Sequence, residues 1–472
     1  MIFLAAAAKK KRDFTDGPLF LPIFTFAIPI MLTGMLQILY NMADNIVVGR
    51  FSGDNLALAA VGSTTSLTNL IVNLFMGIAG GAGVVIAQSF GAREYNRLNR
   101  AVHTAMTFSI ITGVGLSVLG LLISEPMLTL MGTKAELMKK SLLYMRIICI
   151  GIPASAIYNF GAAVLRSVGD SKTPLFILSS SGIVNVILNI VFVICFNMSV
   201  DGVAIATIVA QYISAAAVIT VLVRRKNEKY GLDPKKLGID KHILGRILRY
   251  GVPAGIQGSL FSISNIILTS GVNTLVTTDI SAKTIATNIE GLVHTAMNSY
   301  LHTTMTCAGQ NFGAKKHDRI KKTLLYTLIQ VTVIGVVGGQ IITLFGKELA
   351  GMYVDVADPN RAVVIESTVN LMRFMLTFYF LCGITDTLSG LLRGLGYSFA
   401  PMVMSIVGIC IIRILWIQFI FPSDAFHTLI GLYAIYPISW FITDAMMVVT
   451  LIFALITIKK RFREEEKNTI TT

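Results

Sequence analysis

The chain has 472 residues, of which 54% are hydrophobic and only 14% charged, with a formal net charge of +14. Soluble globular chains carry about 25% charged residues, so this composition excludes a water-soluble globule of this length. The basic residues lie in short clusters between long apolar segments and form no basic domain. This distribution is typical of membrane topology, and it excludes nucleic acid as a partner.

Twelve apolar segments are long enough to cross a bilayer, which takes about 20 helical residues. They are 18–46, 56–87, 101–124, 141–164, 174–197, 202–223, 248–273, 283–311, 323–346, 366–391, 400–421 and 430–458. We therefore expect an all-α polytopic membrane protein with twelve transmembrane helices. Pro29 and Pro253 lie early in the first and seventh segments, where each removes a backbone hydrogen bond and is expected to act as a hinge.

Lysine and arginine concentrate on alternate connections between these segments, which is the pattern of a chain that crosses the membrane at each one. By the positive-inside rule, both termini and the basic linker 224–249 lie in the cytoplasm. The short apolar stretch before the basic cluster at 9–12 does not have the order of a secretory signal peptide. We expect cytoplasmic tails at 1–17 and 459–472.

The two sets of six segments, 18–223 and 250–458, contain related strings in the same order. Phe26-Ala-Ile-Pro-Ile is matched by Tyr250-Gly-Val-Pro-Ala, and Gln88-Ser-Phe-Gly-Ala by Gln310-Asn-Phe-Gly-Ala. Leu165-Arg-Ser-Val-Gly is matched by Leu392-Arg-Gly-Leu-Gly. Because six crossings return the chain to its starting side, the halves form a parallel repeat, two bundles related by a pseudo-twofold axis along the membrane normal. This is a transporter architecture; a duplicated scaffold that transports nothing is the alternative.

Ionisable residues inside the apolar segments are costly and by default serve function. They are Asp44, Glu290, Asp386, Asp444, Arg146, Arg373, Arg413 and His294. Asp44 is the strongest candidate for a functional residue. The equivalent position in the second half is Leu268, so the two halves of the repeat differ there and the carboxylate occurs only in the first half. A buried carboxylate can take up a proton or bind a hard cation such as sodium. The alternative is an acid near the outer headgroups.

Asn185 and Asn189 are four residues apart and thus share one helix face. Their amide oxygens suit sodium, or they form hydrogen bonds between helices; Thr207 is a weaker candidate. Glu290 and Asp386 could receive a cationic substrate or a second proton, the alternative being buried pairs with Arg373, Arg413 or His294. We add Asn41 and Asp444 to the expected substrate cavity.

Motifs of enzymatic chemistry are missing from the sequence. It contains no GxxxxGK[ST], HExxH or GxSxG string, and the linker is too short for a nucleotide-binding domain. The five cysteines show no CxxC or metal spacing. We therefore expect no enzyme, no cofactor and no nucleotide partner, with an ion gradient as the energy source.

The paired QxFGA and LRxxG strings, the proline-containing first segment and Leu39-Tyr-Asn-Met-Ala-Asp-Asn resemble the MATE (multidrug and toxic compound extrusion) family, most closely its DinF-type bacterial branch. The resemblance covers about residues 18–458. It implies a monomeric antiporter of the bacterial cytoplasmic membrane that expels organic, often cationic, compounds as H⁺ or Na⁺ enters.

In that branch the resemblance implies a cation site at the positions of Asp44, Asn185, Asn189 and Thr207. Asp44, Asn185 and Asn189 would be metal ligands only if sodium is the coupling ion. Relatives commonly have aspartate at the position of Asn189, and this departure leaves proton coupling more open. Asp386 matches a functional aspartate of another branch, whose seventh-helix glutamate has no counterpart here.

We interpret the chain as an alternating-access exporter in which ion binding to Asp44 bends the first helix near Pro29 and releases the substrate. Three other functions remain open: a lipid-linked oligosaccharide flippase of the same superfamily, an exporter of non-drug metabolites, and a channel or scaffold.

Overall fold

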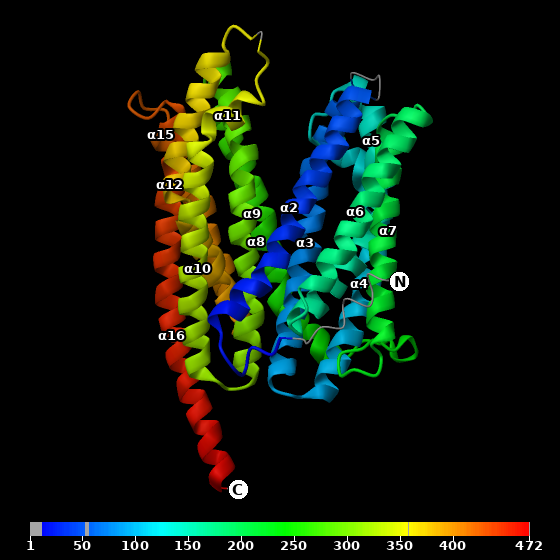
Figure 1. The fold of residues 1–472 in the computed structure, drawn as a ribbon, viewed down its shortest axis with the longest axis vertical. Helices are drawn as coiled ribbons and strands as arrows, with labels where there is room; N and C mark the ends of the chain where they lie inside the picture. The colour runs from blue at the N-terminus through cyan, green and yellow to red at the C-terminus, as the bar shows by residue number, and fades with distance from the viewer. Residues whose placement is uncertain (1–11, 52–55, 357, 472) are drawn as a thin grey trace. The chain divides into compact units, whose positions relative to one another are not determined.

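A computed structural model describes residues 12–51, 56–356 and 358–471, so the basic residues 9–11 lie outside it. In these ranges the chain forms helices and no strand (Figure 1). The first half contains α2 (Phe20–Phe51), α3 (Ala57–Gly91), α4 (Tyr95–Leu130), α5 (Ala135–Ser167), α6 (Lys172–Ile190) with the π-helical turn Val191–Cys195, and α7 (Val200–Arg224).

A connection with one 3-10 turn (Pro234–Lys236) leads into the second half. That half contains α8 (Lys241–Val272), α9 (Thr277–Gly313), α10 (His317–Leu344), α11 (Gly346–Gly351), α12 (Arg361–Gly394), α13 (Phe399–Ser405), α14 (Ile412–Leu415), α15 (Leu429–Tyr433) and α16 (Ile435–Thr471). The π-helical turns Ile406–Ile411 and Trp416–Ile420 join α13 and α14 into one long helical span. The predicted all-α fold with twelve long helical spans is confirmed.

Eleven of the described helical spans are apolar enough to cross a membrane, and their outer faces show large exposed hydrophobic side chains. Leu122 is 72% exposed and Phe453 67% exposed, as expected for contact with lipid. The twelfth span, α9, is more polar, because it contains residues such as Glu290, His294 and Asn298. Glu290 is buried and His294 and Asn298 are partly buried, so protein covers most of these polar groups.

By its contacts the chain divides into two compact units whose boundaries fall inside helices. Unit 1 contains Leu32–Ile256, and unit 2 contains Phe14–Met31 together with the chain from Gln257 onwards. The predicted bundles 18–223 and 250–458 follow the sequence repeat, whereas the packing boundaries cross α2 and α8. They fall just after Pro29 and Pro253, the expected hinge residues.

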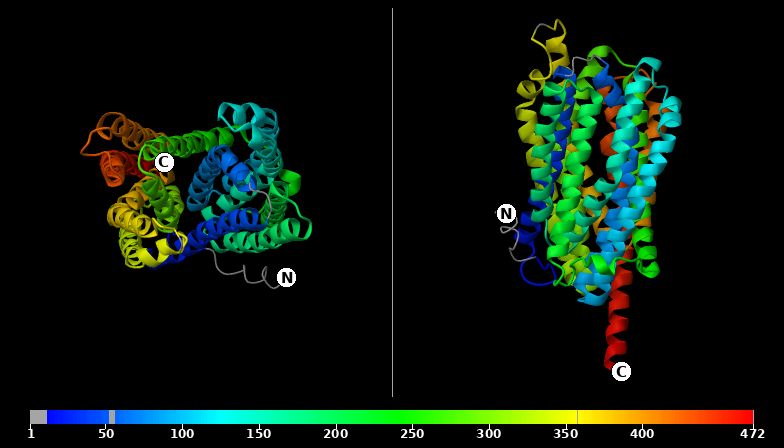
Figure 2. Two further views of the ribbon diagram at one scale, coloured as in Figure 1. Left: turned by 90° about the horizontal axis from the view of Figure 1, so that it is seen from above. Right: turned by 90° about the vertical axis from the view of Figure 1, so that its right-hand side faces the viewer.

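Unit 2 is built around α9 and α12, with α10 and α16 beside α12 (Figure 1). Glycines on α12 allow the two central helices to touch, since a Cβ at Gly394 would lie 2.6 Å from the carbonyl oxygen of Met305. In the predicted C-terminal tail 459–472 the chain is helical, because α16 continues to Thr471 and extends past the other helices of its unit (Figure 2). In unit 1, α5 packs against α3, α4 and α7.

The segment before α2 is anchored in unit 2 by the Gln310-Asn-Phe-Gly-Ala string. The Phe14 backbone N–H donates to Gln310 Oε1 (3.0 Å), and Asn311 Nδ2 donates to the Phe14 carbonyl (3.2 Å). Arg319 Nη2 donates to the same carbonyl at 2.7 Å. Phe14 is 1% exposed and packs edge-to-face on Phe26. The end of the predicted tail 1–17 therefore packs in unit 2, because Gln310 and Asn311 at the end of α9 bind its backbone.

Replacing Phe14 with alanine is expected to destabilise unit 2. Truncating a fully buried phenylalanine costs about 3–5 kcal/mol, so the thermal unfolding midpoint of the purified protein should fall by several degrees. Phe24→Ala is the matched control, since Phe24 lies on α2 with 37% of its surface exposed. Equal midpoints for the two variants would contradict this account.

The matching Gln88 string binds the start of α8 in unit 1. Arg246 Nη2 donates to Gln88 Oε1 at 3.2 Å. Asp240 caps α8, and the backbone N–H groups of Ile243 and His242 that it accepts hold the pKa of its carboxyl below the usual value. Farther along, α8 and α3 meet at glycines: a Cβ at Gly251 would lie 2.5 Å from the Cα of Ile78.

Candidate functional site

Unit 1 contains a polar cluster between α2, α6 and α7. It consists of Asp44, Asn185, Asn189 and Thr207, the four residues of the expected cation site. Asn185 and Asn189 are buried, and Asp44 and Thr207 are partly buried. The i,i+4 spacing on α6 places both amides on the face that meets α2 and α7.

Donors occupy both oxygens of the Asp44 carboxylate. Asn189 Nδ2 donates to Oδ1 at 2.5 Å, and Thr207 Oγ1 lies 3.4 Å from Oδ2. Thr207 Oγ1 also lies 2.9 Å from the Val203 carbonyl, its own helix backbone. Asn185 joins the cluster from the other side, with Nδ2 at 3.4 Å from Thr207 Oγ1. Asp44 is therefore a single, partly buried acid among neutral partners.

The side-chain oxygen of Asn189 is buried and has no hydrogen-bond partner among the described residues. With Asp44 and Asn185 it forms a set of oxygen ligands of the type that a hard cation uses. The set contains one carboxylate, and a sodium ion would have to displace the amide donor that now binds Asp44. Uptake of a proton by Asp44 requires only that one neutral donor turn away.

A close contact between α2 and α6 supports this cluster. Gly182 has no side chain where the ring of Tyr40 lies against α6, and a Cβ there would overlap the ring. The Tyr40 hydroxyl donates to the Ser179 carbonyl at 3.2 Å. Because Tyr40 precedes Asp44 by four residues on one helix face, this contact sets the position of the carboxylate.

Gly182→Ala is expected to displace Tyr40 and to weaken transport by changing the geometry at Asp44. Overpacking of this kind costs about 1–3 kcal/mol, so the melting midpoint should fall as well. Gly80→Ala is the control, because a Cβ at Gly80 has no heavy atom within 4 Å. Transport and stability of Gly182→Ala at the level of Gly80→Ala would exclude the role given to this contact.

Unit 2 contains a cavity of about 380 Å³ between α8, α9, α12, α14 and the α15–α16 region. Glu290 and Asp386 line it, as do Lys283, His294 and Arg413. Asn265, the repeat counterpart of Asn41, also lines it. Its ionisable groups are therefore of both signs.

The acids of unit 2 are held by neutral partners. Asn298 Nδ2 donates to Asp386 Oδ2 at 2.8 Å, and Thr385 Oγ1 donates to Asp444 Oδ1 at 2.6 Å. Asp444 Oδ2 is buried without a partner among the described residues and does not line the cavity. Glu290 is 8% exposed.

The ion pairs considered for these acids do not form. Arg373, Arg413 and His294 make no ion pair with Glu290, Asp386 or Asp444 in the described chain. Arg373 is exposed on α12, and Asn298 rather than an arginine or His294 donates to Asp386. Asn41 is exposed on α2 and does not line the unit 2 cavity.

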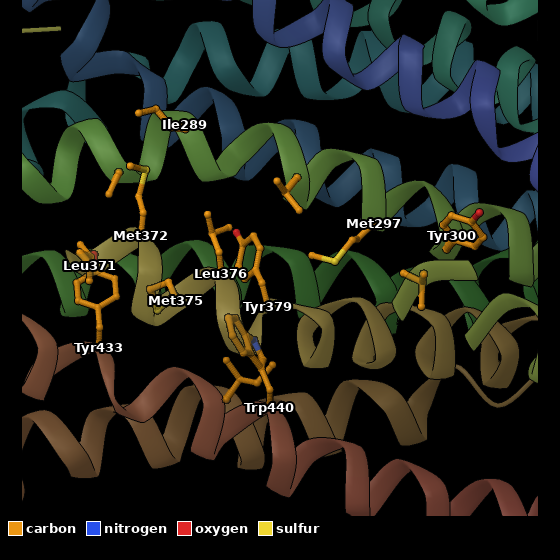
Figure 3. Packing of buried hydrophobic residues seen from close by; sticks show 14 of the residues in the cluster. Ile289, Met297, Tyr300, Leu371, Met372, Met375, Leu376, Tyr379, Tyr433 and Trp440 are labelled. Carbon is orange, nitrogen blue, oxygen red and sulfur yellow. The ribbon is translucent and has the colours of Figure 1, made fainter. Parts of the chain in front are cut away.

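Aromatic rings form one wall of the cavity, and the sequence analysis missed them. Tyr433 and Tyr436 are stacked with centroids 5.0 Å apart, and Tyr436 meets Trp440 edge-on at 5.5 Å. Trp440 in turn contacts Tyr379 of α12 (Figure 3). The spacing of 433, 436 and 440 along one helix face was the available signal.

Comparisons with known proteins bear on the family and the fold of the chain. A family model described as MatE matches residues 29–191 and 253–417. A probable multidrug resistance protein YoeA of Bacillus subtilis is 29% identical over 81% of this chain and 83% of its own length. A probable multidrug resistance protein NorM of Thermotoga maritima is 26% identical over 83% of each chain.

The fold is also that of solved structures. An outward-facing multidrug resistance MATE family transporter of the MOP superfamily superposes with a TM-score of 0.85, covering 97% of this chain and all of that one at 21% identity. A transporter of the same superfamily from Pyrococcus furiosus gives a TM-score of 0.82 at 21% identity, covering 96% of this chain and 99% of that one.

Proposed function

This chain belongs to the MatE family of multi-pass membrane transporters, and on that premise we propose that it is a secondary multidrug exporter driven by protons. It would expel organic, mostly cationic amphiphilic compounds across the cytoplasmic membrane, as a monomer with both termini in the cytoplasm. Relatives named as probable multidrug resistance proteins support the substrate class.

The observation that carries this proposal is Asp44, a partly buried acid of unit 1 that forms no ion pair within the described part of the chain. Among the described residues Asp44 accepts from neutral donors alone, Asn189 and Thr207, and the repeat places Leu268 at the corresponding position of the other half. One carboxylate that exchanges a neutral donor for a proton is sufficient for proton coupling. Sodium coupling would need a fuller set of oxygen ligands around the same acid.

Transport would proceed by alternating access. Asp44 is charged while substrate enters from the cytoplasm, and protonation from outside removes that charge. The helix α2 then changes its bend beyond Pro29, where the boundary between the units falls. Ion and substrate must differ in affinity for the two states, because a ligand that binds both equally shifts no population.

Export of ethidium from proteoliposomes, with proton and sodium gradients imposed separately, tests the proposal. A proton gradient alone should drive export, and a sodium gradient at equal pH should not. Export driven by the sodium gradient would show that sodium, and not a proton, is the coupling ion at Asp44. Absence of dye export together with movement of a fluorescent lipid-linked oligosaccharide would favour the flippase.

A further inference from the structure

Arg413 is a buried cation without a counter-ion among the residues that the structure describes. It is 5% exposed, lies on α14 and lines the unit 2 cavity. Its Nε donates to Ser439 Oγ at 3.2 Å, and its guanidinium carbon lies 3.9 Å from the centroid of the Tyr436 ring. In the described part of the chain, its two terminal amino groups have no hydrogen-bond partner and the residue forms no ion pair.

The acids that share the cavity do not neutralise this cation. Asp386 accepts from Asn298, and Glu290 lies on α9 without an ion pair to Arg413. A buried charge costs several kcal/mol unless a partner and hydrogen bonds compensate for it. Stacking on Tyr436 supplies part of that compensation. The planar amino groups that face the cavity remain available for an anion.

A guanidinium with two free amino groups is suited to a carboxylate, which it can bind through two parallel hydrogen bonds. The stacked Tyr436 and Tyr433 extend the flat surface beside it. A cavity of about 380 Å³ falls within the range of pockets that enclose drug-sized molecules. Lys283, whose Nζ lies 3.4 Å from Thr269 Oγ1, adds a second positive charge to the lining.

We propose that Arg413 anchors an anion subsite in the unit 2 cavity, which binds the carboxylate of aromatic amphiphiles that also bear a cationic group. Glu290 and Asp386 face the cationic part, and Tyr433, Tyr436 and Trp440 contact the ring system. This inference rests on the proposed export function and narrows its substrates, because a purely acidic cavity would repel a carboxylate.

Rhodamine B and its ethyl ester test the subsite, since the two dyes differ in whether the carboxyl group is free. Binding of each dye to the full-length protein in lipid nanodiscs is measured by fluorescence polarisation, and export of each is measured in proteoliposomes. Arg413→Gln is expected to weaken rhodamine B binding about ten- to hundredfold and to leave the affinity for the ester unchanged. Arg373→Gln, an exposed arginine on α12, is the matched control and should change neither affinity.

Arg413→Lys keeps the positive charge but loses the planar pair of guanidinium donors. It is expected to lower the affinity for rhodamine B by less than Arg413→Gln does, and to leave the affinity for the ester unchanged. If Arg413→Gln fails to fold, as judged by loss of its thermal unfolding transition, the lysine variant provides the same comparison. Equal effects on both dyes, or no effect on rhodamine B, would overturn the subsite. Failure of the wild-type protein to export the ester would instead overturn the proposed function.

Discussion

Asp44→Asn is expected to abolish proton-driven export while leaving a folded protein that still binds its substrate. Asparagine keeps the size of the side chain and can still bond to Asn189 and Thr207, which hold the carboxylate at 2.5 and 3.4 Å. It has no titratable proton, so the step that couples the gradient to α2 is lost. The export rate under a proton gradient should fall at least about tenfold, the scale of a lost coupling free energy.

Glu136→Gln is the control for Asp44→Asn, because it makes the same chemical change at an exposed position near the start of α5. It should export at the wild-type rate. Wild-type export by Asp44→Asn, with the same response to pH and sodium, would show that Asp44 is not the coupling residue. Dye binding to the purified variant verifies that the protein is folded.

Asn189→Asp is expected to change the coupling ion from proton to sodium. The amide that now donates to Asp44 at 2.5 Å is fully buried, and the substitution places a second carboxylate against the first. Two carboxylates at hydrogen-bond distance repel each other strongly unless a proton or a cation lies between them. With Asn185 nearby as a further oxygen ligand, the enlarged set suits sodium.

The measurement is dye export driven by a sodium gradient at equal pH on both sides. The wild-type protein should show little export under this condition, and Asn189→Asp should show a rate that rises and saturates with sodium. Asn189→Leu, which removes the donor without adding charge, is expected to lose coupling to both ions. If export by Asn189→Asp depends on protons and sodium as in the wild-type protein, Asp44, Asn185 and residue 189 do not supply the ligands of the coupling ion.

The sequence predicted the twelve helical spans well, because lipid demands long apolar segments and the repeat confirmed their register. Even the segment of α9 was placed by its apolar length, although its polar residues reduce its hydropathy. Asp44 could be singled out because the repeat is broken there, and Asn185 and Asn189 because of their i,i+4 spacing, whereas the full set with Thr207 came from the family resemblance. Their hydrogen bonds to one another depend on how α2, α6 and α7 pack, which no local pattern encodes.

Other features depended on contacts between distant segments and were therefore not predicted. Phe14 was assigned to a tail, since nothing near it in sequence indicates that Gln310 and Asn311 bind its backbone. A pair of Arg413 with Glu290 or Asp386 was one alternative, but Asp386 accepts from Asn298 and Arg413 forms no ion pair among the described residues. The sequence shows which charged residues the helices contain, but it does not show which arginine lies too far from an acid to form an ion pair.

The division of α2 between the two units affects the order in which the protein can assemble during synthesis. Phe14 and Gln310 are 296 residues apart, so at about 5–20 residues per second the ribosome needs roughly 15–60 s to supply the partner of the first segment. During that interval only the part of α2 after Met31 can pack against its native neighbours, because the helices that contact Phe14–Met31 have not yet been synthesised. Unit 2 can therefore assemble only after Gln257 and the residues beyond it have been synthesised and can pack against Phe14–Met31. A truncated chain that ends before α9 would leave the apolar face of Phe14–Met31 without its native contacts.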